Sequence, residues 1–157
     1  MLSRTGHPYS VKVGSTAFQD LSSSPSILIG YSSTQWREVT KDLRFFIDDS
    51  DRGVIRDFGK ATDWYPHLTP DRHTNEDYAI ISRSLNPQTN SILVLVTGCT
   101  QYGTEAAANL ITNPELFAEA LHGAPDGWQR KNLQLVLQVK VIANSPASPK
   151  LIATYYW

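Results

Sequence analysis

The chain has 157 residues, enough for one domain that buries roughly 68–70% of its unfolded surface, and 41% of the residues are hydrophobic, which excludes global disorder. Fourteen basic and fifteen acidic side chains give a net charge of −1. The signs are mixed along the chain, with six basic and six acidic residues between 37 and 60, so we do not expect nucleic-acid binding.

Cysteine content and hydropathy indicate the compartment. Cys99 is the only cysteine, which excludes an internal disulfide and a multi-cysteine zinc site and fits a reducing environment. The segment MLSRTGHPYS lacks the apolar core of a signal peptide, and no run approaches the roughly 20 apolar residues that span a bilayer. We therefore expect a cytoplasmic protein without membrane contact. Because the sequence starts abruptly, we also consider it a domain excised from a longer protein.

The first half of the chain predicts short strands. Residues 9–13 alternate like an edge strand, and the apolar run Ile27–Ile29 before Gly30 is typical of a buried parallel strand. A short helix is predicted before Leu43 from the apolar spacing. Residues 43–47 and 54–59 flank a charged turn and predict a hairpin.

The second half predicts a hairpin, two helices and two further strands. Residues 78–85 and 92–97 form the hairpin, and Thr104 opens an alanine-rich helix. Asn113 and Pro114 are a strong helix start, with a side-chain cap followed by proline at the first helical position. Residues 133–141 alternate as a half-buried strand, and residues 151–157 close the chain as another.

These elements predict an α/β fold over a single domain, residues 1–157. Two buried runs ending in glycine, beside antiparallel hairpins, favour a mixed, partly parallel sheet with helices on its faces. The layering expected is the three-layer arrangement of flavodoxin-like and Rossmann-like proteins.

The turn from Gly98 to Thr104 is the first candidate site. In open α/β sheets, ligands bind beyond the carboxyl ends of the strands, so strands ending at Gly30 and Gly98 would share one rim. The lysine of a phosphate-binding P-loop is missing, and Glu105 is expected in the first turn of the helix, which disfavours a nucleotide triphosphate. Alternatively, the turn is a capped helix start packed on its strand. The predicted ligand-binding residues are Tyr31, Ser32, Ser33, Thr34, Thr100, Gln101, Tyr102, Gly103 and Thr104.

The segment 61–77 is the second candidate, because it carries most of the polar chemistry and no clear periodicity. Asp77, His73 and Glu76 are candidate general acids or bases that could reach over the same rim. The spacing of His67 and His73 matches no helical metal motif, so we expect neither a metal nor a cofactor. Alternatively, these residues form a solvated loop.

Five stretches resemble an uncharacterised bacterial α/β domain of unknown function. They are PSILIG at 25–30, DYAIISRSLNP at 77–87, TGCTQYGTEAAANLITNP at 97–114, KNLQLVLQVKVI at 131–142 and IATYYW at 152–157. The resemblance implies a C-terminal module of regulatory proteins, fused behind a regulatory or DNA-binding domain. It implies no ligand and no catalytic residue.

Three functional hypotheses follow. The leading one is a non-catalytic sensing module that binds a small polar ligand at the rim, because the rim side chains lack a carboxylate or histidine. The second is a hydrolase or glycosyl-type transferase that uses Asp77, His73 or Glu76, and it is favoured if Asp77 or His73 lies within about one hydrogen bond or one water of Thr100 or Cys99. The third is a protein-interaction or homodimerisation module that uses residues 151–157.

Overall fold

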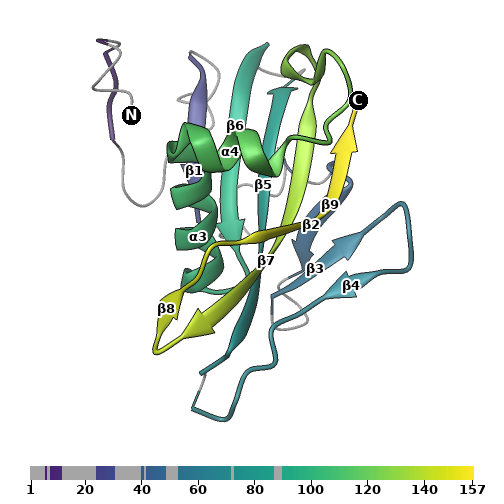
Figure 1. The fold of residues 1–157 in the computed structure, drawn as a ribbon. Coiled ribbons are helices and arrows are strands. Elements are labelled where there is room, and N and C mark those ends of the chain that lie inside the picture. Colours follow the sequence, from purple (N-terminus) through teal and green to yellow (C-terminus); the bar gives the residue numbers. More distant parts are fainter. Residues whose placement is uncertain are drawn as a thin grey trace.

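A computed structural model describes residues 6, 8–11, 24–30, 40, 42–48, 53–71, 73–86 and 90–157. Strands account for 42% and helices for 19% of this structure, so the fold is mostly β. Figure 1 shows a tall main sheet with two helices on one face and a smaller sheet beside it.

The main sheet is mixed and curled, with the strand order β1-β6-β5-β7-β8 and with β9 also paired to β7. Among the described strands of this sheet, β1 and β6 are the only parallel pair, and the other pairs are antiparallel. A bulge interrupts the register between β7 and β9 at Val136 and Leu137. The strands are β1 (Ser26–Ile29), β5 (Glu76–Asn86), β6 (Ser91–Gly98), β7 (Leu133–Ile142), β8 (Ser145–Pro146) and β9 (Lys150–Tyr156).

The second sheet is antiparallel and has the order β2-β3-β4. Its strands are β2 (Phe45–Asp48), β3 (Val54–Asp57) and β4 (Asp63–Trp64). Phe45, Ile47 and Ile55 point inward and pack against Ile80 and Val136 of the main sheet. The alternation of β2 therefore directs one side to a shared core and the other to solvent.

The two helices of the described chain cover the opposite face of the main sheet. Helix α3 (Gln101–Thr112) buries Ala106, Ala107 and Leu110, and Ala107 and Leu110 pack on side chains of β5, β6 and β7. Helix α4 (Pro114–Ala120) follows directly, because Asn113 Oδ1 accepts the amides of Glu115 and Leu116 at 3.1 and 3.2 Å. The predicted start of α4 is thus confirmed.

The prediction of a flavodoxin-like or Rossmann-like three-layer α/β fold is wrong. Within the described residues, helices cover one face of the main sheet only, and the β2-β3-β4 sheet covers part of the other. The segment between β1 and β5 contributes these antiparallel strands, whose apolar alternation suits a sheet packed on one side. Both hairpins and the final strand are confirmed.

Two predicted strands differ in detail. Residues 8–11 belong to no strand, and Tyr9 and Val11 are exposed. Strand β1 is parallel to β6, as expected, but it pairs with β6 alone and only Leu28 is buried. It is therefore an edge strand among the described residues, although its run of apolar residues is typical of a central one.

Candidate functional site

The carboxyl ends of β1 and β6 do lie side by side, as the sequence predicts. Ile29 pairs with Val96 in parallel register, and the Gly30 amide donates to the Val96 carbonyl at 2.8 Å. The proposed ligand-binding residues Tyr31, Ser32, Ser33 and Thr34 follow at once but lie outside the described residues. The other half of the rim, from Thr100 to Thr104, is fully described.

The amino end of α3 holds a carboxylate of the chain itself. Asp77 of β5 is 0% exposed, and its Oδ2 accepts from Thr100 Oγ1 at 2.5 Å and from the Gly103 amide at 2.6 Å. The Thr100 amide donates to both carboxylate oxygens at 3.2 Å. A carboxylate at this position satisfies otherwise unpaired amides and complements the helix dipole. The sequence prediction assigned that role to Glu105, but α3 begins at Gln101 and its first turn holds no acidic residue.

The glycines of this turn serve close packing between the helix and the strands. A Cβ atom on Gly103 would lie 2.5 Å from the Tyr78 carbonyl oxygen and 2.9 Å from Asp77 Oδ2. A Cβ atom on Gly98 would lie 2.3 Å from the Thr104 nitrogen. Both contacts are closer than side chains tolerate. The glycines therefore bring the chain close to itself rather than leaving room for a ligand.

The remaining rim residues divide between structural bonds and solvent. Thr104 Oγ1 accepts from the Gly98 amide at 2.9 Å and donates to the Thr100 carbonyl at 3.2 Å. Because the Thr100 hydroxyl donates to Asp77, both threonine hydroxyls in this half of the rim have protein partners. Gln101 is exposed and Tyr102 is half-buried. The described geometry thus favours the alternative of a capped, packed helix start; ligand binding at the rim stays a prediction.

The contact that favours the enzyme hypothesis is present, since the Thr100 hydroxyl donates directly to Asp77. Its carboxylate is nevertheless fully buried, and its oxygens face amides and one hydroxyl of the protein. His73 lies on an exposed loop, 3.6 Å from Asp71. Glu76 accepts from the Tyr78 hydroxyl and from Gln138 at 2.5 and 2.7 Å. The three candidates thus take separate partners, and this arrangement favours a structural Asp77.

Cys99 lies where β6 meets α3, beside the β2-β3-β4 sheet. Burial, and then the nearby charge of Asp77, raises the pKa of the Cys99 thiol. We therefore expect a thiol reagent at pH 8 to modify the native protein at least about tenfold more slowly than the urea-unfolded protein, because the thiolate is the reactive form. Absorbance of the released thiol dye measures both rates; equal rates would contradict the raised pKa of the Cys99 thiol.

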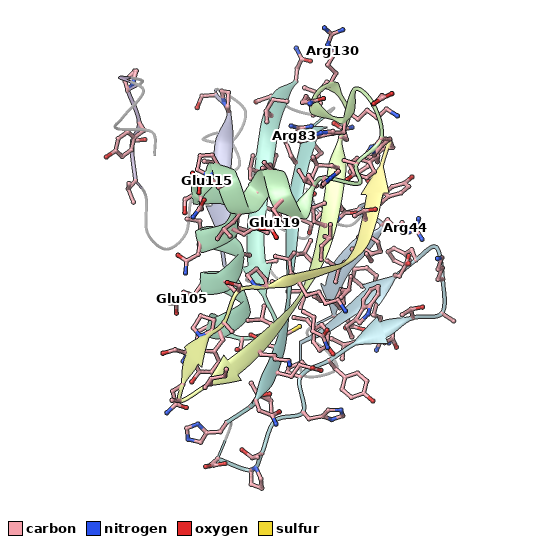
Figure 2. The ribbon with its side chains drawn as sticks, in the orientation of Figure 1. Arg44, Arg83, Glu105, Glu115, Glu119 and Arg130 are labelled. Carbon is pink, nitrogen blue, oxygen red and sulfur yellow. The ribbon has the colours of Figure 1, made fainter. Side chains whose placement is uncertain are left out.

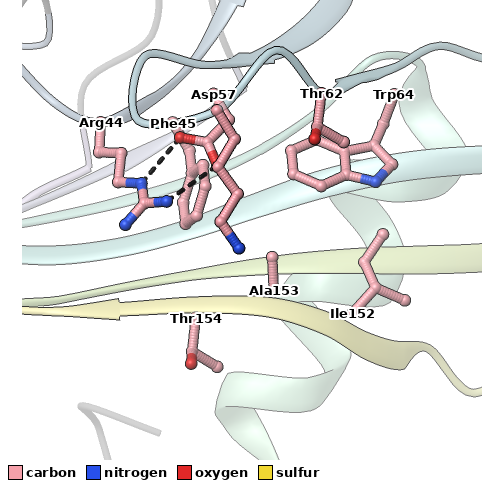
Figure 3. Close-up of a pocket in the computed structure, with 9 residues that line it drawn as sticks. Arg44, Phe45, Asp57, Thr62, Trp64, Ile152, Ala153 and Thr154 are labelled. Atoms are coloured by element: carbon pink, nitrogen blue, oxygen red, sulfur yellow. Dashed lines mark hydrogen bonds and ion pairs between the residues drawn. The ribbon is translucent and has the colours of Figure 1, made fainter.

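Between the two sheets, on the side of β9, lies a hollow of about 290 Å³ (Figure 3). The small sheet and the turn after β3 contribute one wall, and Ile152, Ala153 and Thr154 of β9 contribute the other. The nine lining residues all belong to the described chain: Arg44, Phe45, Asp57, Lys60, Thr62, Trp64, Ile152, Ala153 and Thr154.

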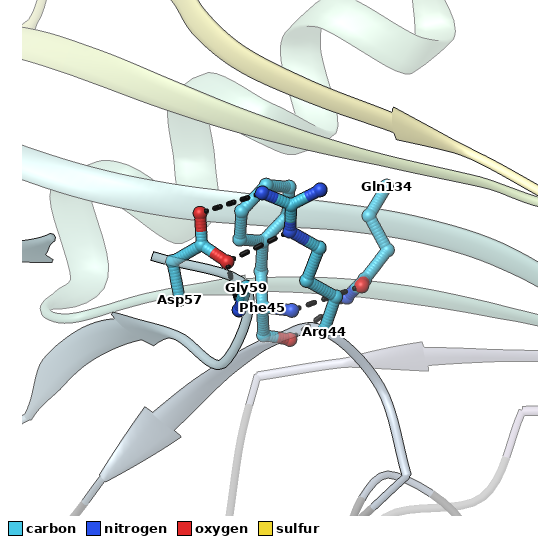
Figure 4. Close-up of polar contacts among 5 residues, drawn as sticks. All are labelled: Arg44, Phe45, Asp57, Gly59 and Gln134. Atoms are coloured by element: carbon cyan, nitrogen blue, oxygen red, sulfur yellow. Dashed lines mark hydrogen bonds and ion pairs between the residues drawn. The ribbon is translucent and has the colours of Figure 1, made fainter. Parts of the chain in front are cut away.

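An ion pair closes one end of the hollow. Arg44 donates from Nε to Asp57 Oδ1 at 2.7 Å and from Nη2 to Asp57 Oδ2 at 3.0 Å, and the Gly59 amide adds a third bond to Asp57 at 2.7 Å (Figure 4). The guanidinium lies 4.9 Å from the centre of the Tyr155 ring on β9. The two hydrogen bonds to Asp57 and the contact with the Tyr155 ring hold the Arg44 guanidinium in one orientation.

The ion pair predicts how acid affects stability. The Arg44 hydrogen bonds hold the pKa of Asp57 below its usual value, against the effect of burial. Because the pKa of the Asp57 carboxyl is lower in the folded protein than in the unfolded protein, the ionised carboxylate stabilises the fold fully above the unfolded-state pKa, near 3.9. This stabilisation is lost as the pH falls through the folded-state pKa. The destabilisation caused by Asp57→Asn should therefore be largest above about pH 5 and shrink below about pH 4. Urea unfolding of both proteins across this range measures it; a difference independent of pH would contradict it.

Sequence reasoning missed this hollow. The pattern of residues 43–59 predicts the hairpin and its inward side chains, but not that Arg44 and Asp57 meet across it or that β9 lies opposite. The position of β9 opposite these residues depends on how the β2-β3-β4 sheet packs against the main sheet, and no local sequence motif encodes this packing. The acidic side chains of α3 and α4, Glu105, Glu115 and Glu119, lie on the helical face of the main sheet and not at the hollow (Figure 2).

The self-association hypothesis concerned residues 151–157, which form most of β9 and Trp157. Among the described residues β9 pairs with β7 alone, and Tyr155 stacks on Trp157 at 5.1 Å between ring centres. The edge of β9 that faces away from β7 is therefore not paired with any described strand. Self-association through this edge stays a prediction.

Comparison of the chain with family models, curated proteins and solved structures gives no match. The resemblance to a regulatory C-terminal module therefore stays a prediction. In the described chain, no helix is long and apolar enough to cross a membrane, and no three metal-binding side chains gather at one point.

Proposed function

We propose that this domain is a non-catalytic binding module for a small polar ligand, which it holds in the hollow between the β2-β3-β4 sheet and β9. The observation that supports this most directly is the lining. Arg44, Lys60, Thr62 and Thr154 supply charged groups and hydroxyls beside the rings of Phe45 and Trp64. Ligand sites typically combine an apolar wall with a few polar groups.

The size of the hollow limits the ligand. Pockets for drug-sized molecules measure roughly 300–1,000 Å³, so about 290 Å³ suits a ligand at or below the small end of that range. The one carboxylate in the lining, Asp57, is held by Arg44 and by the Gly59 amide. General acid–base catalysis needs a group free to exchange a proton with the substrate, so this lining supports binding better than catalysis.

The test is a screen of small polar metabolites by protein NMR on the uniformly ¹⁵N-labelled chain. Ligands should shift the indole N–H of Trp64 and the backbone amides of Ile152, Ala153 and Thr154. A leucine at Ala153 would occupy part of the hollow, and Ala153→Leu should therefore abolish these shifts.

Ala118→Leu is the matched control, because Ala118 is an exposed residue of α4 on the other face of the main sheet. It should leave binding unchanged. Ligands that shift Gln101 and Tyr102 instead would return the site to the predicted rim. A screen in which no ligand at millimolar concentration shifts the β9 amides would refute the proposal.

A further inference from the structure

The charges around the hollow are unequal. Of the nine lining residues, all within the described chain, Arg44 and Lys60 are cationic and Asp57 is anionic, which leaves one net positive charge. Asp63 lies between two lining residues in sequence, but its carboxylate is bonded to Arg56 at 2.7 Å. We infer that the ligand is a small monocarboxylate, bound through the free edge of the Arg44 guanidinium and through Lys60; this inference rests on the proposed function.

The unused edge of Arg44 has the shape that a carboxylate requires. Asp57 accepts from Nε and from one N–H of Nη2, which together form one side of the planar guanidinium fork. Nη1 and the second N–H of Nη2 form the end of the fork, and no protein acceptor is bonded to Nη1 in the described structure. Two parallel N–H groups bind the two oxygens of a carboxylate together.

The position of the guanidinium is set before a ligand arrives. Asp57 holds it from one side, and its carbon lies 5.3 and 4.9 Å from the ring centres of Phe45 and Tyr155. Gly59 leaves the space that it needs, because a Cβ atom there would lie 2.7 Å from the guanidinium carbon. A preorganised donor costs less ordering entropy when it binds.

The rest of the lining favours a ligand that carries a single negative charge on a short apolar body. One negative charge balances the net charge of Arg44, Lys60 and Asp57, whereas a phosphate dianion would bring excess negative charge next to Asp57. The Trp64 ring and the Ile152 side chain face the part of the hollow away from Arg44 (Figure 3). These groups suit a ring or a short alkyl chain.

The test compares benzoate with benzamide, which match in size and shape and differ in charge. Both are titrated by NMR at pH 7 and constant ionic strength, with inorganic phosphate and benzylamine as further probes. Benzoate should bind about tenfold or more tightly than benzamide, because hydrogen bonds between charged groups are stronger than neutral ones. Added salt should weaken benzoate binding and leave benzamide binding unchanged.

Two variants examine the cations separately. Lys60→Gln removes one charge from an exposed side chain, and Gly59→Ala displaces the Arg44 guanidinium without removing its charge. Each should weaken benzoate binding by about tenfold and leave benzamide binding within about twofold. Lys140→Gln, which changes an exposed lysine of β7 outside the lining, is the control and should change neither.

The outcomes separate this inference from the proposed function. Equal binding of benzoate and benzamide in the hollow, or tighter binding of phosphate or benzylamine, would overturn the monocarboxylate and leave a ligand site in place. Benzoate affinity unchanged in both Lys60→Gln and Gly59→Ala would also overturn it. If neither these probes nor the metabolite screen shifts the Trp64 and β9 signals, both proposals fail.

Discussion

Replacement of Asp77 by alanine is expected to lower the free energy of unfolding by about 3 kcal/mol or more, because several donors lose their acceptor at once and each buried unsatisfied group costs about 1–3 kcal/mol. The Gly103 amide is strongly affected, since this residue is buried and its amide donates to Asp77 Oδ2 at 2.6 Å. The Thr100 amide and hydroxyl lose the same partner. Urea unfolding at pH 7 measures the effect.

Glu105→Ala is the matched control, because it also removes a carboxylate near the start of α3. Glu105 is exposed, and the change should stay within about 0.5 kcal/mol. Helix α3 should lose hydrogen-exchange protection in Asp77→Ala before the rest of the sheet does. A loss of stability below about 1 kcal/mol in Asp77→Ala would contradict the role of Asp77 as the acceptor that ties α3 to β5.

Gln134→Leu is expected to lower the free energy of unfolding by about 2–4 kcal/mol, because it leaves two buried backbone groups without partners. Gln134 is 0% exposed; its Nε2 donates to the Phe45 carbonyl at 2.8 Å, and its Oε1 accepts the Phe45 amide at 3.0 Å (Figure 4). The bond from the Phe58 amide to the Arg44 carbonyl shows that Phe45 and Asp57 form a non-hydrogen-bonded pair of the hairpin. The amide and carbonyl of Phe45 therefore point away from β3.

Gln138→Leu is the control for this substitution. Gln138 lies on the same strand, is half-buried and donates to Glu76 at 2.7 Å, so its loss should cost less than about 1 kcal/mol. The Phe45 amide should exchange with solvent faster in Gln134→Leu than in either the wild type or Gln138→Leu. Equal stability of the two variants would mean that Gln134 does not join the sheets.

The local elements of this protein could be predicted from its sequence because their signals are short-range. Alternation gives the hairpins β2-β3 and β5-β6, and the caps at Asn113 and Pro114 give the start of α4. The parallel pairing of β1 and β6, and hence the neighbouring positions of Gly30 and Gly98, also followed from their apolar runs. The alternation of each strand, each apolar run and the helix cap are contained within about a dozen residues.

The three-layer α/β prediction failed because apolar runs do not report what covers a strand. Ile27 and Ile29 read as buried, yet they are 48% and 68% exposed in the described structure. In the sequence, Gly98 and Gly103 fit either a ligand-binding loop or a packed helix start, and in the structure they allow the helix to approach the strands. A glycine pattern shows that a side chain is excluded at a position, and only the folded chain shows which atoms exclude it.

The sequence by itself determined that the chain has no internal disulfide, and it determined the hairpins β2-β3 and β5-β6, the strands β7 and β9 and the start of α4. Only the tertiary structure decided that Asp77 is the carboxylate at the start of α3, that Gln134 joins the sheets and that Arg44 meets Asp57 beside β9. The partners in these contacts lie 23 to 26, 89 and 13 residues apart. Contacts at such separations depend on how sheets and helices pack, and the local spacing of residue types does not record that packing.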